Sequence, residues 1–293
     1  MTLKCTLIAT LGTEPQVITA GLDLLLARHE PIRRVEVIHT GGNAAIEQAV
    51  QTLHAAFAQP PYRDRIALHL TPIQDERGGS VSDVETPNAI QWAFRTLYRS
   101  VWQAKQNGER LHLLLAGGRK TLSVFALVTA QMLFDEGDHL WHLYSAGEFL
   151  ASRRLHPQPG DEVHLVPVPV LLREALSPAL THLRAVSDPY EALERLRRLD
   201  LEKRVCEAQV FVETVLTEGE RRVVEPLVRE GLSDHELAQR LYLSKRTVER
   251  HLRSAYSKAA VHWGLEDINR AQLVALLGLY YQYRHDENAG KSA

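Results

Sequence analysis

The sequence predicts two folded domains: an N-terminal α/β domain built on a doubly wound, mainly parallel sheet, and a C-terminal all-α domain. Three observations lead to this prediction. The chain has 293 residues, which is more than a single hydrophobic core usually organises. Short apolar runs alternate with helix-length segments in the N-terminal part, whereas the C-terminal part has only helical patterns. Hydrophobic residues at 45% and charged residues at 24% are the usage of an ordinary globular chain.

The alternation in the N-terminal domain runs from Leu3 to Ser145. Apolar strands joined by helices form parallel sheets with right-handed crossovers, so helices should cover both faces of this sheet. The expected strands are LKCTLIAT, RRVEVIHT, RIALHLTPI, LHLLLAG and HLWHLYS, and the expected helices are Gln16–Arg28, Ala44–Ala58, Thr86–Gln106 and Thr121–Phe134.

After the fifth strand, the pattern predicts a β-hairpin at the sheet edge, formed by Phe149–Leu155 and Val163–Val170. A helical connector follows, and Ser187-Asp188-Pro189 predicts a helix start inside it. Its apolar face has two interpretations, packing on its own domain or a dimer seam. The predicted boundaries are 1–172 for the α/β domain, 173–215 for the connector and 216–293 for the all-α domain.

Cysteine usage and hydropathy limit the class of protein. Cys5 and Cys206 form neither a disulfide framework nor a metal-ligand spacing. No segment has the length and hydropathy of a signal peptide or a membrane-spanning helix, so we expect a cytoplasmic protein that does not bind membranes. The net charge of −2 means that any nucleic-acid binding must come from local clusters of charge. The strand histidines are expected in the core rather than as ligands: His39, His69, His112 and His142.

Glycine and small polar residues follow the strands at the edge where doubly wound sheets bind ligands. Glycines allow close backbone approach, and helix N-termini beside them favour phosphate. The loop from Gly117 to Ser123 is the strongest signal, because it combines flexible backbone, two cations and two hydroxyls at a helix start. It fits neither a Walker loop nor a dinucleotide fingerprint. The alternative interpretation is an ordinary glycine-rich turn whose Arg119 and Lys120 face solvent.

A long polar loop between Gln74 and Thr86 has two further interpretations. It is a lid over this edge, or its carboxylates form a cation site. Because acidic loops are usually just solvated, we expect no metal and no cofactor. No His–Cys pair or paired carboxylates in this half resemble a general base, which favours sensing over fast catalysis. The loop carboxylates are Asp75, Glu76, Asp83 and Glu85.

Three loops carry characteristic motifs: Ala9-Thr10-Leu11-Gly12-Thr13 followed by Pro15, Thr40-Gly41-Gly42, and Ala116-Gly117-Gly118-Arg119-Lys120-Thr121. Together they resemble the CARF domain of CRISPR-associated proteins over about residues 1–172. The Gly-Gly-Arg-Lys loop is typical of the CARF group that includes stand-alone ring nucleases. The resemblance implies a Rossmann-like homodimer that binds a cyclic oligoadenylate, made by type III CRISPR complexes as an alarm, with cyclic tetra-adenylate as the expected ring.

The resemblance also implies roles for single residues. In that group the lysine and a first-loop hydroxyl bind the ring and cleave it slowly, which corresponds here to Lys120 and to Thr10 or Thr13. An even-numbered ring has two equivalent halves, so a two-fold dimer can present the same loops to each. Because members of that group cleave the ring, the alternative to a ring-responsive regulator is a metal-independent ring nuclease. The expected ligand-binding residues are Thr10, Leu11, Gly12, Thr13, Thr40, Gly41, Gly42, Asn43, Gly117, Gly118, Arg119, Lys120 and Thr121.

Three capped helices follow one another closely after Leu216. Thr217 with Glu220, and Ser233 with Glu236, have the capping-box spacing, and Ser244 precedes a third helix. Short helices with tight turns are typical of a helix-turn-helix. The segment EGLSDHELAQRLYLSKRTVERHLRSAYSKA, with LT-x-x-E-R-x-V before it, resembles the LuxR-type DNA-binding domain over about 216–282. A long loop over 260–270 and a fourth helix over Ala271–Tyr283, expected to supply a dimer contact, complete the domain.

The third helix concentrates positive charge, with six Lys or Arg and one Glu between Arg240 and Lys258. Its charged side lies opposite the apolar positions, as expected of a helix that enters the major groove of double-stranded DNA. The alternative is a solvated basic helix in a protein-interaction module. The resemblance places Glu249, Arg250 and Arg253 toward the groove, and Lys245, Thr247 and Lys258 nearer phosphates, with Arg246 on the same charged side. Together the two domains predict a CRISPR-linked transcription regulator.

Overall fold

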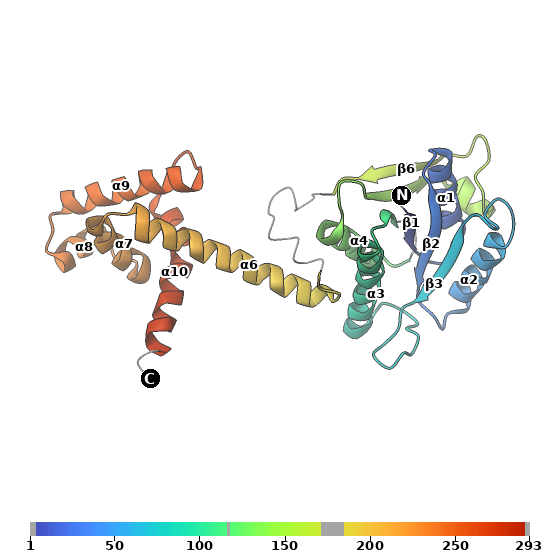
Figure 1. The fold of residues 1–293 in the computed structure, drawn as a ribbon, viewed down its shortest axis with the longest axis horizontal. Coiled ribbons are helices and arrows are strands. Elements are labelled where there is room, and N and C mark those ends of the chain that lie inside the picture. The colour runs from blue at the N-terminus through green and yellow to red at the C-terminus, as the bar shows by residue number, and fades with distance from the viewer. Residues whose placement is uncertain (1–3, 116–117, 171–184, 291–293) are drawn as a thin grey trace. The chain divides into compact units, whose positions relative to one another are not determined.

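The structure is a computed structural model that describes residues 4–115, 118–170 and 185–290 (Figure 1). The chain divides into two compact units, Met1–Arg195 and Leu196–Ala293. Among the described residues, no helix has the length and hydropathy needed to cross a membrane.

The first unit is built on a six-stranded sheet of order β3-β2-β1-β4-β5-β6. All neighbouring strands are parallel except β5 and β6. This is the strand order of the doubly wound dinucleotide-binding fold, so the predicted fold class is confirmed. The strands are β1 (Cys5–Thr10), β2 (Ile32–His39), β3 (Ala67–Pro72), β4 (Arg110–Leu115), β5 (His139–Ser145) and β6 (Val163–Val168). The helices between them are α1 (Gln16–Ala27), α2 (Ala44–Phe57), α3 (Pro87–Gln106) and α4 (Lys120–Leu133).

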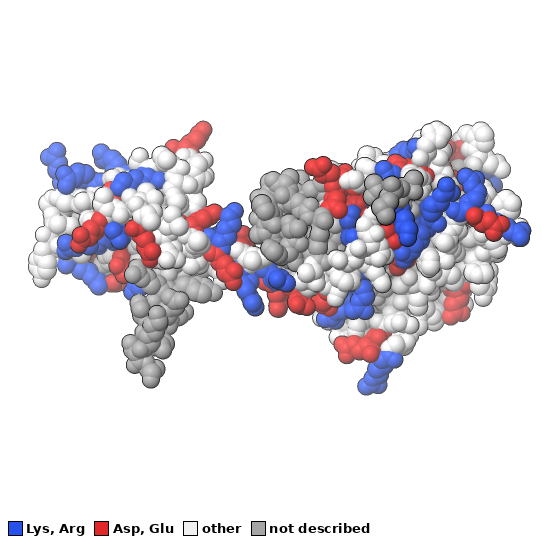
Figure 2. Space-filling model, in the orientation of Figure 1, with Lys and Arg blue, Asp and Glu red and all other residues white. Residues whose placement is uncertain are grey.

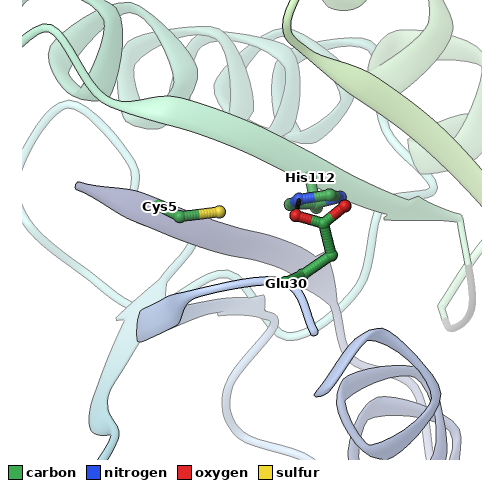
Figure 3. A group of neighbouring side chains, drawn as sticks. All are labelled: Cys5, Glu30 and His112. Carbon is green, nitrogen blue, oxygen red and sulfur yellow. Dashed lines mark ion pairs between the residues drawn. The ribbon is translucent and has the colours of Figure 1, made fainter. Parts of the chain in front are cut away.

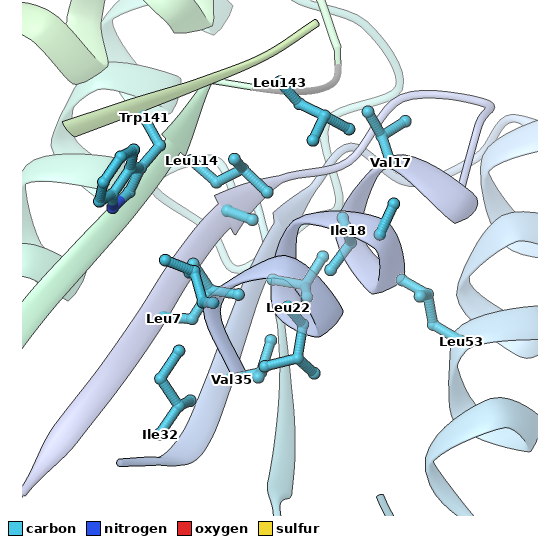
Figure 4. Close-up of a cluster of buried hydrophobic side chains, with 14 of the residues drawn as sticks. Leu7, Val17, Ile18, Leu22, Ile32, Val35, Leu53, Leu114, Trp141 and Leu143 are labelled. Atoms are coloured by element: carbon cyan, nitrogen blue, oxygen red, sulfur yellow. The ribbon is translucent and has the colours of Figure 1, made fainter. Parts of the chain in front are cut away.

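The alternation of side chains along β1 shows why both faces of the sheet are covered. Leu7 and Ala9 point into the core beneath α1 and α2, where Leu22 and Leu53 are fully buried (Figure 4). On the opposite face, α3 and α4 lie side by side (Figure 1) and bury the apolar side of α3, including Leu97. Central parallel strands lie between helices in this way, which explains their nearly continuous apolar sequences.

The predicted edge hairpin is wrong in its first strand. Residues Gly147–Ser152 form a short helix, α5, instead of a strand. Phe149 is buried in the core on this helix, and β6 pairs antiparallel with β5 rather than with residues 149–155. The apolar side chains of this short segment fit one turn of a buried helix as well as a strand, and periodicity over so few residues cannot separate the two. The antiparallel edge strand itself is present.

Helix α6 (Pro189–Val210) begins at the predicted Ser-Asp-Pro signal and belongs in part to each unit. Its start is attached to α3, because Arg95 Nε donates to Asp188 Oδ2 at 2.6 Å and Tyr98 donates to the Val186 carbonyl at 3.2 Å. Farther along α6, Cys206 is exposed, in contrast to the buried Cys5. Residues 171–184, which include the start of the predicted connector, lie outside the described part of the chain.

The second unit packs a π-helical turn and four helices around one core (Figure 1). They are η3 (Phe211–Val215), α7 (Glu218–Glu230), α8 (Asp234–Leu241), α9 (Lys245–Trp263) and α10 (Arg270–Gly290). Both predicted capping boxes are present, and the Ser244 side chain caps α9. The predicted loop over 260–270 is partly wrong, because α9 continues to Trp263 and ends at Gly264, which adopts a left-handed conformation. Leu273, Leu277, Tyr280 and Tyr281 of α10 are buried in this core.

Candidate functional site

A cavity of about 510 Å³ opens at the carboxyl ends of the parallel strands in the first unit. Ligands of doubly wound folds bind at this edge, and the volume suits a ligand of small-molecule size. Loops that follow β1, β2, β3, β4 and β5 all contribute to its wall. Residues predicted as ligand-binding that line it are Leu11, Gly12, Thr13, Thr40, Asn43, Gly118 and Arg119. Further lining residues are Glu14, Val17, Ile46, Ser82, Asp83, Leu122, Leu143, Ser145 and Leu150.

The first loop presents one of its two predicted hydroxyls to the cavity. Thr13 is exposed and lines it. Thr10 is only 2% exposed and does not line it. As the last residue of β1, Thr10 is in the body of the sheet, whereas Thr13 lies beyond the strand end. The sequence pattern alone does not separate the two, because the end of the strand decides between them.

The two cations of the Gly-Gly-Arg-Lys loop have different surroundings. Arg119 donates to Asp83 through Nε at 2.8 Å and to Glu85 through Nη2 at 2.5 Å, and its Nη2 also contacts Asp83. The hydrogen bond from Arg119 lowers the pKa of Asp83 and raises that of the guanidinium. Lys120, the first residue of α4, is exposed and makes no ion pair with the described residues. Gly117 lies outside the described residues, and Thr121 is half-buried.

The N-terminus of α4 has no side-chain cap, since Arg119 occupies the cap position without a capping hydrogen bond. Gly118 before it has a φ of 90°, a conformation that side chains rarely adopt. A Cβ on Gly118 would lie 3.0 Å from Leu122 Cδ1 and 3.5 Å from the Leu11 carbonyl oxygen. The positive φ and the tight contact with Leu122 therefore favour glycine here, whereas the first loop is only in ordinary contact distance. The open backbone N–H groups of the first turn, beside Lys120, have the chemistry that binds phosphate.

The long loop between Gln74 and Thr86 is folded against the end of β2. Gly41 N–H donates to the Val81 carbonyl at 2.8 Å, and Val81 N–H donates to the Ile73 carbonyl at 2.9 Å. Ser80 occupies the space where a side chain at position 41 would lie, which explains the glycine. Gly41 and Gly42 consequently support this loop and do not line the cavity, whereas Ser82 and Asp83 do.

Three of the four loop carboxylates have partners within the protein, and the fourth, Glu76, is exposed. Asp75 accepts the backbone N–H groups of Arg77 and Gly79 at 2.9 and 2.7 Å and so closes a turn. Asp83 and Glu85 both pair with Arg119. Glu14 and Asp83 line the same cavity, which sequence reasoning did not anticipate because the two residues follow different strands. That no carboxylate pair in this half acts as a general base stays a prediction.

A second group of potential ligands, Cys5, Glu30 and His112, lies elsewhere in this unit, with ligand atoms within 4.8 Å of one another (Figure 3). Trp141 Nε1 donates to His112 Nδ1 at 2.9 Å, so the imidazole carries its proton on Nε2, which faces Glu30 at 3.5 Å. Burial, with nearby His139 and Arg110, lowers the pKa of His112 to about 3. A metal would need the Nε2 lone pair that this tautomer lacks. The prediction that the strand histidines lie in the core is confirmed for His112 alone, because His69 and His142 are exposed and His39 is half-buried.

In the second unit, α9 presents a basic surface, visible over this helix in Figure 2. Arg246, Arg250 and Arg253 are exposed and form no ion pair with the described residues. The opposite side of the helix buries Val248 and Leu252. Of the remaining predicted contacts, Lys245 lies 4.0 Å from exposed Glu249, and half-buried Thr247 takes part in the Ser244 cap. The three arginines are therefore accessible on one side of the helix, and their contact with DNA stays a prediction.

Lys258 faces the interior of this unit instead. Its Nζ donates to Glu220 Oε2 at 2.7 Å and to the Val215 carbonyl at 3.2 Å, while Ser254 donates to Glu220 Oε1 at 2.7 Å. Burial alone would raise the pKa of Glu220, but hydrogen bonds from Lys258, Ser254 and Thr217 lower it to about 2. Glu220 thus caps α7 and joins it to α9.

Comparison with known proteins agrees with the division into two units. Residues 14–201 match the family described as CRISPR-associated protein NE0113, which covers more than half of the chain. Residues 214–275 match the bacterial regulatory proteins of the luxR family. No curated protein matches the chain. Both resemblances predicted from the loops and the capped helices are confirmed. The chain therefore belongs to the CRISPR-associated NE0113 family and carries, after its CRISPR-associated part, a luxR-type helix-turn-helix domain.

Proposed function

We propose that this protein is a CRISPR-linked transcription regulator that binds a cyclic oligoadenylate, cyclic tetra-adenylate in the first place, and whose affinity for double-stranded DNA changes when the ring is bound. The ring binds in the cavity at the carboxyl edge of the sheet. The DNA binds to the basic face of α9.

The proposal that the first unit binds the ring is supported by the surroundings of Lys120. An exposed ammonium without an ion pair to the described residues stands at an uncapped helix N-terminus, next to a cavity with apolar and hydroxyl-bearing walls. The ammonium and the free backbone N–H groups at this helix N-terminus both attract phosphate. The apolar side chains of Val17 and Leu143 suit the faces of a nucleobase, and the polar side chain of Asn43 lines the same cavity. Lys120 and Thr13 are therefore the central residues of the proposed ring site.

The proposal that α9 binds double-stranded DNA is supported by the three exposed arginines of this helix. Arginine forms bidentate hydrogen bonds with guanine O6 and N7 in the major groove. The α9 N-terminus, capped by Ser244, is the end that a recognition helix directs to base edges. We leave Lys258 out of the proposed DNA contacts, because its ammonium pairs with Glu220.

A homodimer completes the proposal. A ring of four identical nucleotides has two equivalent halves, so two copies of the site related by a two-fold axis bind it symmetrically. The same symmetry implies an operator with inverted half-sites about one helical turn apart. Sedimentation with and without the ring measures the assembly, and a monomer saturated with ring would contradict this part.

One set of measurements tests the central claim. Labelled cyclic tetra-adenylate and cyclic hexa-adenylate are titrated into the full chain, and DNA sites selected from a random pool are then bound with and without saturating ring. We expect tight binding of at least one ring and a change in DNA affinity on saturation. A chain that binds neither ring, or whose DNA affinity is the same in both states, would contradict the proposal.

A second candidate function is cleavage of the ring, which the shared lining of Thr13, Glu14 and Asp83 favours. A ribose 2′-hydroxyl attacks the adjacent phosphorus, the bond to the 5′-oxygen breaks, and the 2′-hydroxyl proton ends on that oxygen, leaving a 2′,3′-cyclic phosphate. Lys120 would stabilise the charge on the phosphate. Asp83 is a weak base here, because Arg119 lowers its pKa. Chromatography of the incubated ring tests this function, since linear products appear only if the chain cleaves.

A further inference from the structure

The contact between Arg119 and two carboxylates joins the loops that follow β3 and β4. Asp83 receives two hydrogen bonds from the guanidinium and Glu85 receives one. Thirty-four or more positions separate the partners in sequence, so the contact exists only because both loops reach the same strand edge. Asp83 and Arg119 both line the cavity.

The carboxylates are held in place independently of Arg119. Their loop is anchored to β2 by the hydrogen bond between Gly41 and Val81, and the Asp75 turn closes its far end. Val84 N–H donates to Asp83 Oδ1 at 2.7 Å, which orients that carboxylate further. Asp83 therefore lies at a defined place on the cavity wall, and Glu85 follows it two positions later in the same loop.

The pairing is nonetheless open to water. The side chains of Arg119, Asp83 and Glu85 are 51%, 40% and 66% exposed. Ion pairs this exposed are weak, because solvent screens them and each side chain can turn to another partner. A ligand phosphate in the cavity would offer the guanidinium a bidentate acceptor. The same phosphate would be repelled by Asp83.

We propose that Asp83 and Glu85 determine the affinity of this site, by competing with ligand phosphate for Arg119. The proposal rests on the proposed function, and it adds that binding exchanges one set of anionic partners of Arg119 for another. Lys120 gives the site its charge in the free protein, and Arg119 contributes only after the exchange. The carboxylates thereby set a threshold ring concentration below which the site stays empty.

Isosteric neutral variants of the full chain test the exchange. The dissociation constant of labelled cyclic tetra-adenylate is measured for wild type, for Asp83→Asn with Glu85→Gln, for Arg119→Gln, and for the combination of all three. Glu76→Gln is the matched control, since Glu76 is an exposed carboxylate of the same loop with no ion pair to the described residues. Circular dichroism checks that each variant folds.

We expect the neutral acid pair to tighten binding about twofold to tenfold, the range that two exposed ion pairs allow, and Arg119→Gln to weaken it. In the Arg119→Gln background, removing the acids should tighten binding clearly less than it does in wild type, because only the direct repulsion between the acids and phosphate is then relieved. Equal tightening in both backgrounds would show general charge repulsion and overturn the exchange. Weaker binding by the neutral pair would overturn it too, because the acids would then be positioning Arg119 for the ring. Wild-type protein that binds neither the tetra- nor the hexa-adenylate ring would instead contradict the proposed function itself.

Discussion

Two ion pairs of the protein, one from each unit, lie in opposite settings. In the luxR-type unit, Lys258 pairs with Glu220, whose side chain is 5% exposed. In the CRISPR-associated unit, Arg119 pairs with carboxylates that are both well exposed. A buried carboxylate left without its partner is costly, whereas an exposed pair can separate in water. The first pair therefore supports the fold, and the second is available for exchange with a ligand.

The comparison extends to the cations left without ion pairs to the described residues. Lys120 stands alone beside the cavity, whereas three arginines stand together on α9. A single ammonium suits a small anionic ligand, and a row of guanidinium groups suits a polyanion whose charges repeat along its length. The surface beside the cavity thus carries fewer free cations than α9, just as the proposed cyclic oligoadenylate carries fewer phosphates than DNA.

Replacing the buried carboxylate should have the largest effect. Glu220→Gln should lower the stability of the luxR-type unit by about 3 kcal/mol, the free-energy equivalent of the lowered pKa. Because the folded-state pKa lies below its value in the unfolded chain, this stabilisation is complete above about pH 4.5 and is lost as the pH falls toward 2. Native-state hydrogen exchange of α7 and α9 in the full chain measures it.

Glu249→Gln is the matched control, because Glu249 is exposed and lies at the 4.0 Å limit of an ion pair with Lys245. Its exchange rates should stay at the wild-type values. Equal protection in the Glu220 and Glu249 variants would remove the distinction between buried and exposed pairs.

Lys120 of the CRISPR-associated unit, which has no ion pair to the described residues, gives the next effect. Lys120→Ala should weaken binding of the cyclic oligoadenylate by about 1–3 kcal/mol, through loss of a charge-assisted hydrogen bond, and should abolish any cleavage. Arg33→Ala removes an exposed cation near the start of β2, at the other edge of the sheet, and should leave the affinity unchanged. Titration calorimetry compares the variants, and equal affinities would exclude Lys120 from the site.

On α9, Arg253→Ala should weaken binding to the selected DNA site by about 1–3 kcal/mol and relax the preference at one base position. Arg229 on α7 pairs with Glu225 at 3.3 Å and lies over the Tyr281 ring, so Arg229→Ala serves as the control for lost charge. Binding-site selection with each variant gives the base preference. An unchanged preference in the Arg253 variant would place this residue away from the base edges.

The smallest effect is expected where the exposed pair is broken. Asp83→Asn should leave the thermal midpoint of the CRISPR-associated unit at its wild-type value, because water replaces the lost partner of Arg119. Differential scanning calorimetry of the full chain measures this midpoint. A clear drop would make the Asp83 pair structural, like that of Glu220, and the comparison between the units would fail.

Much of the fold follows from local sequence signals. Thr217 with Glu220, Ser233 with Glu236, and Ser244 mark three helix starts that the structure confirms. Such caps act within one turn of helix, so neighbouring residues suffice to predict them. The strand predicted over Phe149–Leu155 is wrong, because Gly147–Ser152 form a short helix and so few residues show no decisive period.

The partners of the charged side chains were not predictable in the same way. Arg119 and Asp83 are 36 positions apart, and Lys258 and Glu220 are 38 positions apart. No local period connects residues at such distances, and only the folded chain brings them together. The sequence does indicate that Asp83 and Arg119 follow neighbouring segments of the α/β pattern, which predicts one edge but no pairing.

The contrast between the two cysteines offers a practical reporter. Burial raises the pKa of the Cys5 thiol, so this group is neutral and inaccessible at pH 7. Cys206 is exposed on α6, the helix that belongs in part to each unit. A maleimide fluorophore added to the unmodified protein will therefore react at one position only. Its emission then follows α6 in real time as ring and DNA are added, without any engineered substitution.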